Sequence, residues 1–412
     1  MKVFLILGAG TAGTMIARKM VQKLNPREWK VIVVDKDDDH FYQPGYLFLP
    51  FGIYQPKDVV KPKHKFIPGN VEFILSEIEL IEPDANRVKL VKDGKVINYD
   101  YLVIATGADI HPEETDGLKD SGWGRNIFDF YTADGAAALG EFLKKWEGGR
   151  LVLNVVENPI KCPVAPLEFL LLADWYFTKR GIRNKVDLVY ATPLSEAFTK
   201  PTSAAALGDL LKHRGINLET DFSVGEVDST NNKIISYDER EVPYDLLVSV
   251  PTNKGAPVIG RSGMGDVLDF VPTKKDYLQS QKWENVWVLG DAANIPASKA
   301  GAVVHFQMET AVENILAHIA GKEMPAKFDG HSLCYIESGY NKAVMIDFSY
   351  EQEPVFGTYP LPVVGPFSLL RETTINHWGK MAFYYMYYYL MLKGINVPLP
   401  TKFSMAGKIK NN

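Results

Sequence analysis

Residues Lys2 to Gly13 read KVFLILGAGTAG, an apolar strand that runs directly into a Gly-x-Gly-x-x-Gly pattern. The next residues, TMIARKMVQKL, have helical spacing, and a second strand over 30–34 ends in Asp35. Such glycines allow the backbone to approach a pyrophosphate, and an acid about 20 residues further on binds a ribose hydroxyl. The stretch therefore predicts an α/β dinucleotide-binding fold. The predicted contacts are Gly8, Gly10, Thr11, Ala12, Gly13, Asp35 and Lys36.

Two later motifs indicate which dinucleotide is bound. One hydrophobic strand ends in Ala105-Thr106-Gly107, and a second, VWVLGDA, ends in Gly290-Asp291. In this order the three motifs resemble those of the flavoprotein disulfide reductases with two dinucleotide domains, and the resemblance implies FAD, whereas a domain that binds NAD alone would not need the two later strands. We therefore predict FAD as the cofactor. Two further predicted FAD contacts are Pro44, in an aromatic and proline-rich segment, and Ile78, in a β-meander expected over 72–90.

Between these motifs, the alternation of strands and helices predicts a second Rossmann-like unit inserted in the first. Strands are expected at 151–156, 186–191 and 246–250, and helices near 166–180 and 204–214. The predicted fold class is α/β, with two Rossmann-like dinucleotide-binding domains. The predicted division is 1–112 and 284–325 for the FAD domain, 113–283 for the second domain, and 326–412 for an aromatic-rich C-terminal region.

The second unit lacks the glycine loop that a nicotinamide nucleotide would require. Its first strand and helix are joined within VLNVVENPIKCPVAPLE, residues 152–168, and no glycine lies between Arg150 and Gly181. Pro163 and Pro166 have no N–H group to offer a phosphate. Cys162 stands where the glycines would be.

Cys162 and Cys334 are the two cysteines of the chain and the predicted redox pair. Cys162 is expected at or just before a helix N-terminus, where free amides and the helix dipole stabilise a thiolate. Glu168, in the first two turns of that helix, is placed to handle a proton near the sulfur. The alternatives are two unrelated buried thiols and a solvated glutamate.

Composition excludes some classes of protein. A net charge of −5 over 412 residues gives no reason to expect a nucleic-acid partner, and two cysteines do not form a disulfide framework. Met1 begins a strand and not a signal peptide, so we expect the chain to stay in the cytoplasm. The most apolar window, Met381 to Leu392, is too short to cross a membrane.

Three segments resemble a known family. KCPVAPLEF, GDAANIPASKAGAVVHFQ and HSLCYIESG are similar to segments of sulfide:quinone oxidoreductases and of the flavoprotein subunit of flavocytochrome c sulfide dehydrogenase. The resemblance runs from the N-terminus to about Met345. It implies that hydrosulfide attacks a bridge between Cys162 and Cys334, with Cys334 facing the flavin. It also implies that the Lys299 ammonium stabilises the reduced flavin.

The sequence departs from that family at several positions. Many members carry a third cysteine near the equivalent of 126–132, where this chain reads NIFDFYT. Histidines expected near 128–134 and near Phe198 are also missing. The flavocytochrome branch anchors FAD through a cysteine where this chain has Tyr42, so attachment by cysteine is excluded at that position.

The C-terminal region predicts the electron acceptor. Its aromatic residues and interspersed basic residues are typical of a segment that lies on a membrane surface, so we predict a monotopic enzyme on the cytoplasmic side, with a quinone as acceptor. The alternative is a domain or subunit interface, as in a homo-oligomer. The family resemblance implies that the quinone lies beside the flavin near Tyr335 and Phe367, with Tyr340 and Phe356 as further candidates. The basic residues are Arg371, Lys380, Lys393, Lys402, Lys408 and Lys410.

The sequence thus predicts a membrane-associated, FAD-dependent enzyme that oxidises sulfide to sulfur or polysulfide and reduces quinone. One alternative is an enzyme similar to type II NADH:quinone oxidoreductase, which needs the glycine loop that 152–168 lacks. A flavin-binding scaffold or sensor without turnover is the other, suggested by the missing third cysteine and histidines.

Overall fold

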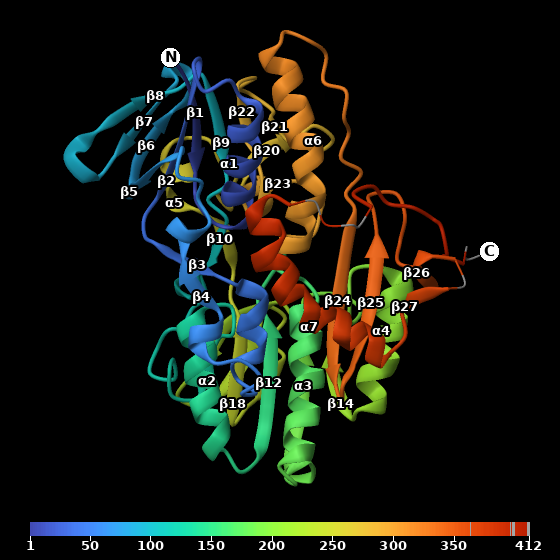
Figure 1. The fold of residues 1–412 in the computed structure, drawn as a ribbon. Helices are drawn as coiled ribbons and strands as arrows, with labels where there is room; N and C mark the ends of the chain where they lie inside the picture. Colours follow the sequence, from blue (N-terminus) through green and yellow to red (C-terminus); the bar gives the residue numbers. More distant parts are fainter. Residues whose placement is uncertain (363, 396, 398–399, 410–412) are drawn as a thin grey trace.

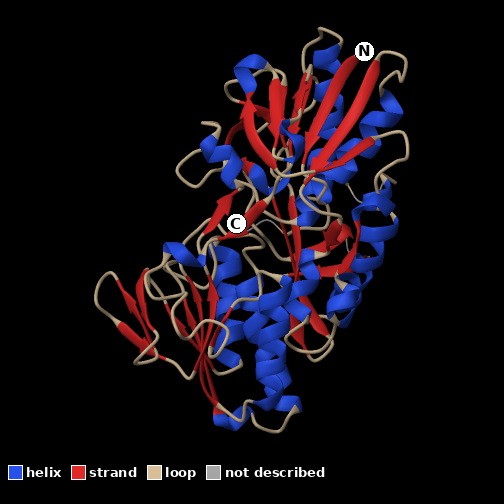
Figure 2. Cartoon of the chain, turned by 90° about the vertical axis from the view of Figure 1, so that its left-hand side faces the viewer, coloured by secondary structure: helices blue, strands red, loops and turns tan. Residues whose placement is uncertain are grey.

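The structure is a computed structural model that describes residues 1–362, 364–395, 397 and 400–409. Two sheet-and-helix units lie one above the other, and a C-terminal sheet stands beside them (Figure 1). Figure 2 shows the same two units from the side, with long helices around the lower one. Lys410, one of the predicted basic residues, lies outside the described residues.

The first unit is an eight-stranded sheet in the order β23-β20-β21-β22-β9-β1-β2-β5. Its central strands are parallel, and helices α1 and α6 pack against each other. β20 and β21 lie within 113–283, so the sequence assigned them to the wrong unit. The bounds are β1 Lys2–Leu7, α1 Thr11–Lys23, β2 Trp29–Asp35, β5 Glu72–Leu75, β9 Tyr101–Ile104, β20 Val271–Lys274, β21 Gln279–Ser280, β22 Val286–Val288, β23 Ala293–Asn294 and α6 Gly301–Ile319.

Burial explains why the central strands are apolar throughout. Residues Phe4 to Leu7 of β1 are fully buried, because a parallel sheet covered on both faces has no solvent-facing side. Smaller elements surround the sheet and the second unit. These are β3 Asp39–Phe41, β4 Val60–Pro62, β6 Ile78–Glu82, β7 Arg87–Leu90, β8 Val96–Asn98, β15 Val224–Asp228, β16 Lys233–Ser236, β17 Glu241–Pro243 and α5 Pro257–Arg261.

The second unit is a five-stranded parallel sheet in the order β11-β18-β12-β13-β14. The three strands predicted for it are confirmed as β12, β13 and β18. An antiparallel pair, β10 and β19, connects the two units. The bounds are β10 Ala108–Ile110, β11 Ile127–Phe128, α2 Ala133–Lys145, β12 Gly149–Val155, α3 Ala165–Lys179, β13 Val186–Ala191, α4 Pro201–His213, β14 Ile216–Glu219, β18 Leu246–Val250 and β19 Asn253–Gly255.

The C-terminal region is a four-stranded sheet in the order β24-β25-β27-β26, followed by helix α7. Helix α3 of the second unit packs on β24, and α7 packs on β24 and β25. β24 therefore lies between the two helices that carry the site. The bounds are β24 Ser332–Gly339, β25 Lys342–Phe348, β26 Gly357–Leu361, β27 Gly365–Leu369 and α7 Thr374–Tyr389.

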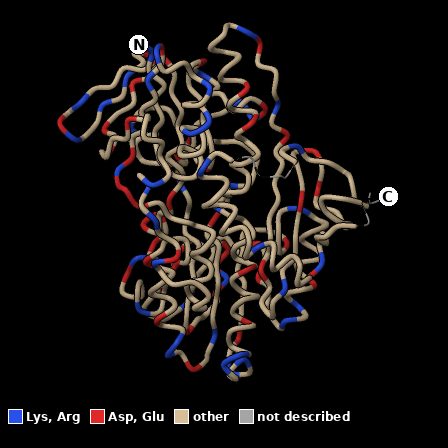
Figure 3. Tube along the Cα trace, in the orientation of Figure 1, with Lys and Arg blue, Asp and Glu red and all other residues tan. Residues whose placement is uncertain are grey.

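Two surface properties bear on partners. Charged residues of both signs are distributed over the outer loops, with no face of one sign in this view (Figure 3). Within the described residues, no helix combines the length and the apolar character that a membrane span requires.

Candidate active site

The glycine loop after β1 has one side that the protein fills and one that it leaves open. Gly8 has φ +92°, and a Cβ there would lie 2.4 Å from the Ala105 carbonyl oxygen. A Cβ on Gly13 would lie 1.8 Å from the Gly8 carbonyl oxygen, whereas one on Gly10 would meet nothing within 4 Å. Gly10 also precedes α1 without a side-chain cap, and the first turn of α1, Thr11 to Gly13, holds no acid. The helix N-terminus is thus open to a phosphate.

Asp35 is held at the end of β2 in the orientation that a ribose would need. Its carboxylate accepts hydrogen bonds from the Ala9 N–H at 2.6 Å and from the Lys36 N–H at 2.7 Å. The buried Lys63 ammonium lies 3.0 Å from the same carboxylate. Ser76 N–H donates to the Asp35 carbonyl oxygen, which brings the start of β6 at Ile78 to this end of the sheet. Lys63 belongs to a basic patch to which the sequence assigned no function.

The motifs at 105–107 and 290–291 add further groups to this predicted cofactor site. Thr106 follows β9, and within the described residues its buried hydroxyl has no hydrogen-bond partner. Gly107 and Gly290 have φ of +74° and +68°, in the left-handed region that favours glycine. The Asp291 carboxyl faces the pocket, where burial raises its pKa and Lys299 opposes the shift. The open Gly10, the oriented Asp35 and the unsatisfied Thr106 hydroxyl fit FAD.

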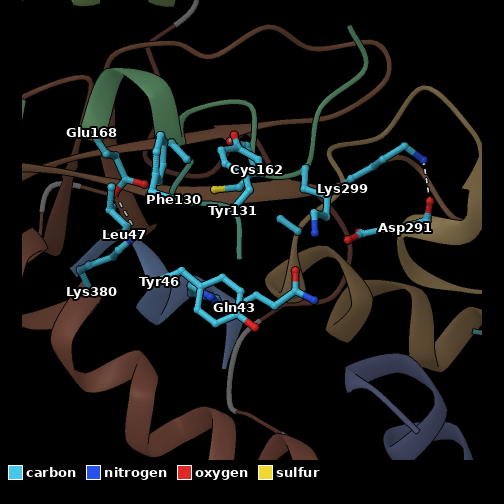
Figure 4. Close-up of a pocket in the computed structure, with 15 residues that line it drawn as sticks. Gln43, Tyr46, Leu47, Phe130, Tyr131, Cys162, Glu168, Asp291, Lys299 and Lys380 are labelled. Carbon is cyan, nitrogen blue, oxygen red and sulfur yellow. Dashed lines mark hydrogen bonds and ion pairs between the residues drawn. The ribbon is translucent and has the colours of Figure 1, made fainter. Parts of the chain in front are cut away.

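A pocket of about 590 Å³, partly open to solvent, lies between the two units. Figure 4 shows Cys162 across from Tyr46 and Gln43, with Glu168 and Lys380 at one end and Lys299 and Asp291 at the other. The remaining lining residues are Pro44, Leu47, Phe130, Tyr131, Lys161, Ala165, Ala300 and Gly301.

The backbone fixes Cys162 at the junction of the two units. Cys162 has φ +46°, which is uncommon for a residue with a side chain. Its N–H donates to the Lys299 carbonyl oxygen at 2.7 Å, and its own carbonyl oxygen accepts from the Ala165 N–H at 2.8 Å. The thiol lies three residues before α3, close to the predicted place. However, burial raises the pKa of the Cys162 thiol, and Glu168 adds to the shift. Desolvation therefore opposes the predicted stabilisation of a thiolate by the helix N-terminus.

The structure brings Cys334 to the same site. Cys334 lies on β24, which packs on α3, and both thiols are free. Burial raises the pKa of Cys334 to about 12, and Lys380 opposes the shift. Cys162, Glu168 and Lys380 act on one another electrostatically, and Cys334 contributes to the shift at Cys162. Cys334 is buried and Cys162 is partly exposed at the pocket, and both interact with the same charged pair, Glu168 and Lys380.

Glu168 and Lys380 form a buried ion pair beside the thiols. Glu168 is only 1% exposed, and its Oε1 accepts from Lys380 Nζ at 2.8 Å and from the Glu337 N–H at 2.7 Å. Burial raises the pKa of the Glu168 carboxyl, and Lys380 opposes that shift. The solvated alternative for Glu168 is excluded. Lys380 is a site residue that the sequence misassigned to the membrane surface, because only the packing of α7 on β24 places it here.

Lys299 is buried and held by the segment that follows Gly290. Its Nζ donates to the carbonyl oxygens of Asp291 at 2.7 Å and Ala293 at 2.9 Å, and it lies 3.8 Å from the centre of the Phe270 ring. Desolvation lowers the pKa of Lys299 to about 8. Lys299 is therefore not an exposed loop lysine. Lys299 stands at the end of the pocket that holds Asp291.

The four predicted quinone residues separate in the structure. Tyr335 and Phe367 meet edge to face with ring centres 5.7 Å apart, next to Gly379 on α7. Tyr340 lies at the turn after β24, and its hydroxyl contacts Asp174 and Thr178 on the far half of α3. Tyr340 is therefore separated from the Tyr335–Phe367 pair. Phe356 precedes β26, and its carbonyl oxygen accepts from the Ile409 N–H.

The aromatic residues of α7 have two different environments. Tyr387 and Tyr388 are 1% exposed, and the Tyr387 hydroxyl lies 2.7 Å from both Thr11 Oγ1 and His40 Nε2. The buried side of α7 therefore reaches the glycine loop. Other α7 side chains are exposed, and their spacing of three, seven and four places them along one stripe. These are Ile375, Trp378, Tyr385 and Tyr389, with exposed fractions of 45%, 66%, 63% and 53%.

Known proteins match over most of the chain. The family model described as pyridine nucleotide-disulphide oxidoreductase matches residues 2–139. The mitochondrial sulfide:quinone oxidoreductase of Dictyostelium discoideum is 30% identical over 350 residues, which cover 84% of this chain and 77% of that protein. The mitochondrial sulfide:quinone oxidoreductase of Mus musculus is 26% identical over 397 residues, which cover 95% and 86%.

Solved structures confirm the fold class. The structure of the sulfide:quinone oxidoreductase of Aquifex aeolicus superimposes with a TM-score of 0.81 at 22% identity, over 97% of this chain and 93% of that one. The predicted α/β architecture with Rossmann-like domains is confirmed.

Proposed function

The chain belongs to the sulfide:quinone oxidoreductase family, and we propose that it is an FAD-dependent enzyme that oxidises sulfide at Cys162 and Cys334 and reduces a quinone. The observation that carries the proposal is that two cysteines far apart in sequence share one cluster with Glu168 and Lys380. FAD, when bound, supplies two-electron chemistry that connects a thiol pair to a quinone. Gly8, Gly10, Gly13, Asp35, Thr106 and Asp291 would hold it.

The cluster suits thiol–disulfide exchange. In the oxidised enzyme, hydrosulfide attacks one sulfur of a Cys162–Cys334 bridge, which leaves a persulfide on that cysteine and a thiolate on the other. A buried thiolate needs a nearby cation, because desolvation penalises its charge. Lys380 supplies that cation, since its pKa is raised by Glu168 and Cys162 and it stays protonated. Glu168 lies where it would accept or return a proton beside the sulfur.

A nicotinamide donor is disfavoured by the loop between β12 and α3. The Lys161 N–H donates to Asn253 Oδ1 at 3.0 Å, and the Cys162 N–H donates to the Lys299 carbonyl oxygen. These amides are engaged by the protein, so they are not free to bind phosphate. The paired charges and thiols around Cys162 also favour turnover over a role as a flavin scaffold.

The quinone would bind at Tyr335 and Phe367, because this aromatic pair adjoins Lys380. The exposed stripe of Ile375, Trp378, Tyr385 and Tyr389 would rest on the membrane surface, where aromatic residues favour the interface. Lys393 lies 5.3 Å from the centre of the Tyr389 ring, where it would face anionic lipid. We propose peripheral attachment on the cytoplasmic side, from which quinone reaches the pocket without a spanning helix.

One anaerobic experiment tests the proposal. The purified protein is mixed with sulfide and, separately, with NADH, while flavin absorbance is followed. We expect bleaching by sulfide and return of the absorbance when a short-chain benzoquinone is added. Bleaching by NADH alone would contradict the proposal and favour an NADH:quinone oxidoreductase. Bleaching by neither donor would favour a scaffold or sensor.

A further inference from the structure

The proposed reaction needs a route for protons into a buried site. Quinone takes up two electrons and two protons, whereas hydrosulfide gives two electrons and one proton when it becomes sulfur. The balance is HS⁻ + Q + H⁺ → S⁰ + QH₂, so one proton must enter from solvent in each turnover. Glu168 and Lys380 adjoin the thiols, but their side chains are 1% and 12% exposed. Both line the pocket, so water reaches them there only through the space that FAD and quinone would fill.

A second buried pair connects this cluster to solvent. His377 Nδ1 lies 2.9 Å and 3.0 Å from the two carboxylate oxygens of Glu337. The Glu337 side chain is 3% exposed and the His377 side chain is 20% exposed, so His377 is the member of the pair that reaches water. The Glu337 carboxylate on β24 thus contacts a partly exposed imidazole and interacts electrostatically with Lys380 and Glu168 of the buried cluster.

The spacing of these residues on β24 and α7 places the two contacts next to each other. Tyr335 and Glu337 are two apart on β24 and point to the same face, and His377 and Lys380 are three apart on α7 and lie on one side. Lys380 donates to the Tyr335 carbonyl oxygen at 3.1 Å, and His377 binds Glu337. The Glu337 N–H also donates to Glu168. Tyr335 on β24 is therefore paired with Lys380 on α7, and Glu337 on β24 with His377 on α7.

We propose that His377 and Glu337 are the proton relay that supplies Lys380 and the bound quinone. The proposal rests on the proposed function, since it assumes that quinone is reduced beside Tyr335. A proton from solvent passes to His377, then to the Glu337 carboxylate, and then toward Lys380, one helical turn from His377. Lys380 gives its proton to the reduced quinone and is recharged by the relay. Both residues are positioning residues, because they act through Lys380.

The electrostatics of Glu337 suit transfer at neutral pH. The groups that face it are His377 and Lys380 from α7 and Glu168 from α3. Burial raises the pKa of Glu337 to about 7, while His377 and Lys380 oppose the shift. A group whose pKa is close to the working pH gives and takes protons with little cost in either direction.

The test separates proton delivery from sulfide chemistry. Wild type, Glu337→Gln and His377→Gln are reduced with dithionite, and reoxidation by a short-chain benzoquinone is followed by stopped flow between pH 6 and 8.5, conditions chosen to span the pKa of about 7. Both variants should reoxidise roughly 10²-fold more slowly, the lower range for the loss of acid–base catalysis. Added imidazole should restore much of the rate in His377→Gln. Bleaching by sulfide should stay close to the wild-type rate.

A matched control is His111→Gln. His111 Nδ1 lies 2.8 Å from Glu113 Oε1, and the His111 side chain is 18% exposed, close to the value for His377. Wild-type reoxidation is expected in this variant. Infrared difference spectra of wild type minus Glu337→Gln should also contain a carboxyl band that titrates near pH 7.

The outcomes distinguish the two proposals. Equal reoxidation rates and pH profiles in wild type, Glu337→Gln and His377→Gln would overturn the relay. Equal slowing by His111→Gln would also overturn it, because the effect would not be specific to the path. Failure of wild type to bleach with sulfide would sink the proposed function alone, since dithionite-reduced enzyme still reports on the relay. A wild type that quinone cannot reoxidise would sink both.

Discussion

Each unit of this protein has a strand-to-helix connection, β1 to α1 in the first and β12 to α3 in the second, and the two connections serve different chemistry. After β1, only Gly8 to Gly10 separate the strand from α1, and Gly10 faces open space. After β12, residues 156–164 separate the strand from α3, and Cys162 sits there in a left-handed conformation. The shorter loop leaves its amides to a phosphate. The longer loop ties its amides to Lys299 and Asn253 and presents a thiol instead.

The difference teaches that the parallel-sheet scaffold does not fix what the loop binds. Helix α1 has no acid in its first turn, as a phosphate site requires, whereas α3 carries Glu168 there. A carboxylate at that place repels an anion through both its own charge and its competition for the helix N-terminus. The Glu168 carboxylate is tolerated there because Lys380, on α7, forms an ion pair with it. The second loop is thus a site completed by a distant helix.

The largest expected effect is in the first loop. In Gly13→Ala the new Cβ would lie 1.8 Å from the Gly8 carbonyl oxygen, so the backbone must move and the purified protein should carry no flavin. Gly10→Ala is the matched control, because its Cβ meets no protein atom within 4 Å. Gly10→Ala should keep the melting temperature of the apoprotein even where flavin binding weakens. The flavin-to-protein absorbance ratio and thermal unfolding measure both. Full flavin content in Gly13→Ala would break the comparison.

In the second loop, Cys162→Ser should retain FAD and lose sulfide-driven quinone reduction. We expect a loss of roughly 10³-fold or more, as for removal of a nucleophile from a unit that acts together. Cys334→Ser should show a loss of similar size, and the double variant should lose little more. Steady-state quinone reduction and flavin content provide the measurement. Wild-type activity in either single variant would mean that the pair does not handle sulfur.

The ion pair between Glu168 and Lys380 predicts a stability effect at the start of α3 that has no counterpart at the start of α1. Lys380→Met leaves the Glu168 carboxylate buried without its cation, which should cost about 3–5 kcal/mol in the free energy of unfolding. Adding Glu168→Gln should recover much of that loss, because the unpaired charge is gone. Urea denaturation of the two single variants and the double variant measures the coupling. An additive double variant would show that Lys380 does not hold Glu168.

Local patterns in the sequence predicted the parts of the site that depend on local geometry. The glycine loop, the strands before Thr106 and Asp291, and the position of Cys162 follow from spacing within one strand, turn and helix. Tyr340 was grouped with the Tyr335–Phe367 pair because it is close to Cys334 in sequence. However, the five residue steps from Tyr335 to Tyr340 run along β24 into the turn that follows it and span up to about 17 Å, which takes Tyr340 to the far half of α3.

The remaining site residues depend on packing that sequence spacing does not encode. Lys380 and His377 reach Glu168 and Glu337 only because α7 lies against β24. The aromatic composition of α7 marked this segment as unusual, but composition does not distinguish its exposed stripe from the tyrosines that contact the glycine loop. Tyr387 belongs to the second group, since its hydroxyl lies beside Thr11 and His40.

The smallest expected effect concerns the contact between His40 and Tyr387 and depends on pH. His40 is buried, and desolvation lowers its pKa from 6.5 to about 4 in the folded protein. Between these values the unfolded chain binds a proton that the folded chain does not, so stability is fully present above pH 6.5 and is lost as pH falls through 4. Protonation of His40 therefore changes the free energy of unfolding by at most about 3 kcal/mol. His40→Asn should therefore flatten the fall in unfolding free energy across this range.

His305→Asn is the matched control, because burial also lowers the pKa of His305 to about 4. Both variants should flatten the pH dependence, but only His40→Asn should also weaken flavin binding, because His40 contacts Ala9 in the glycine loop. Equal flavin affinity in the two variants would show that α7 and the first loop are not coupled through His40.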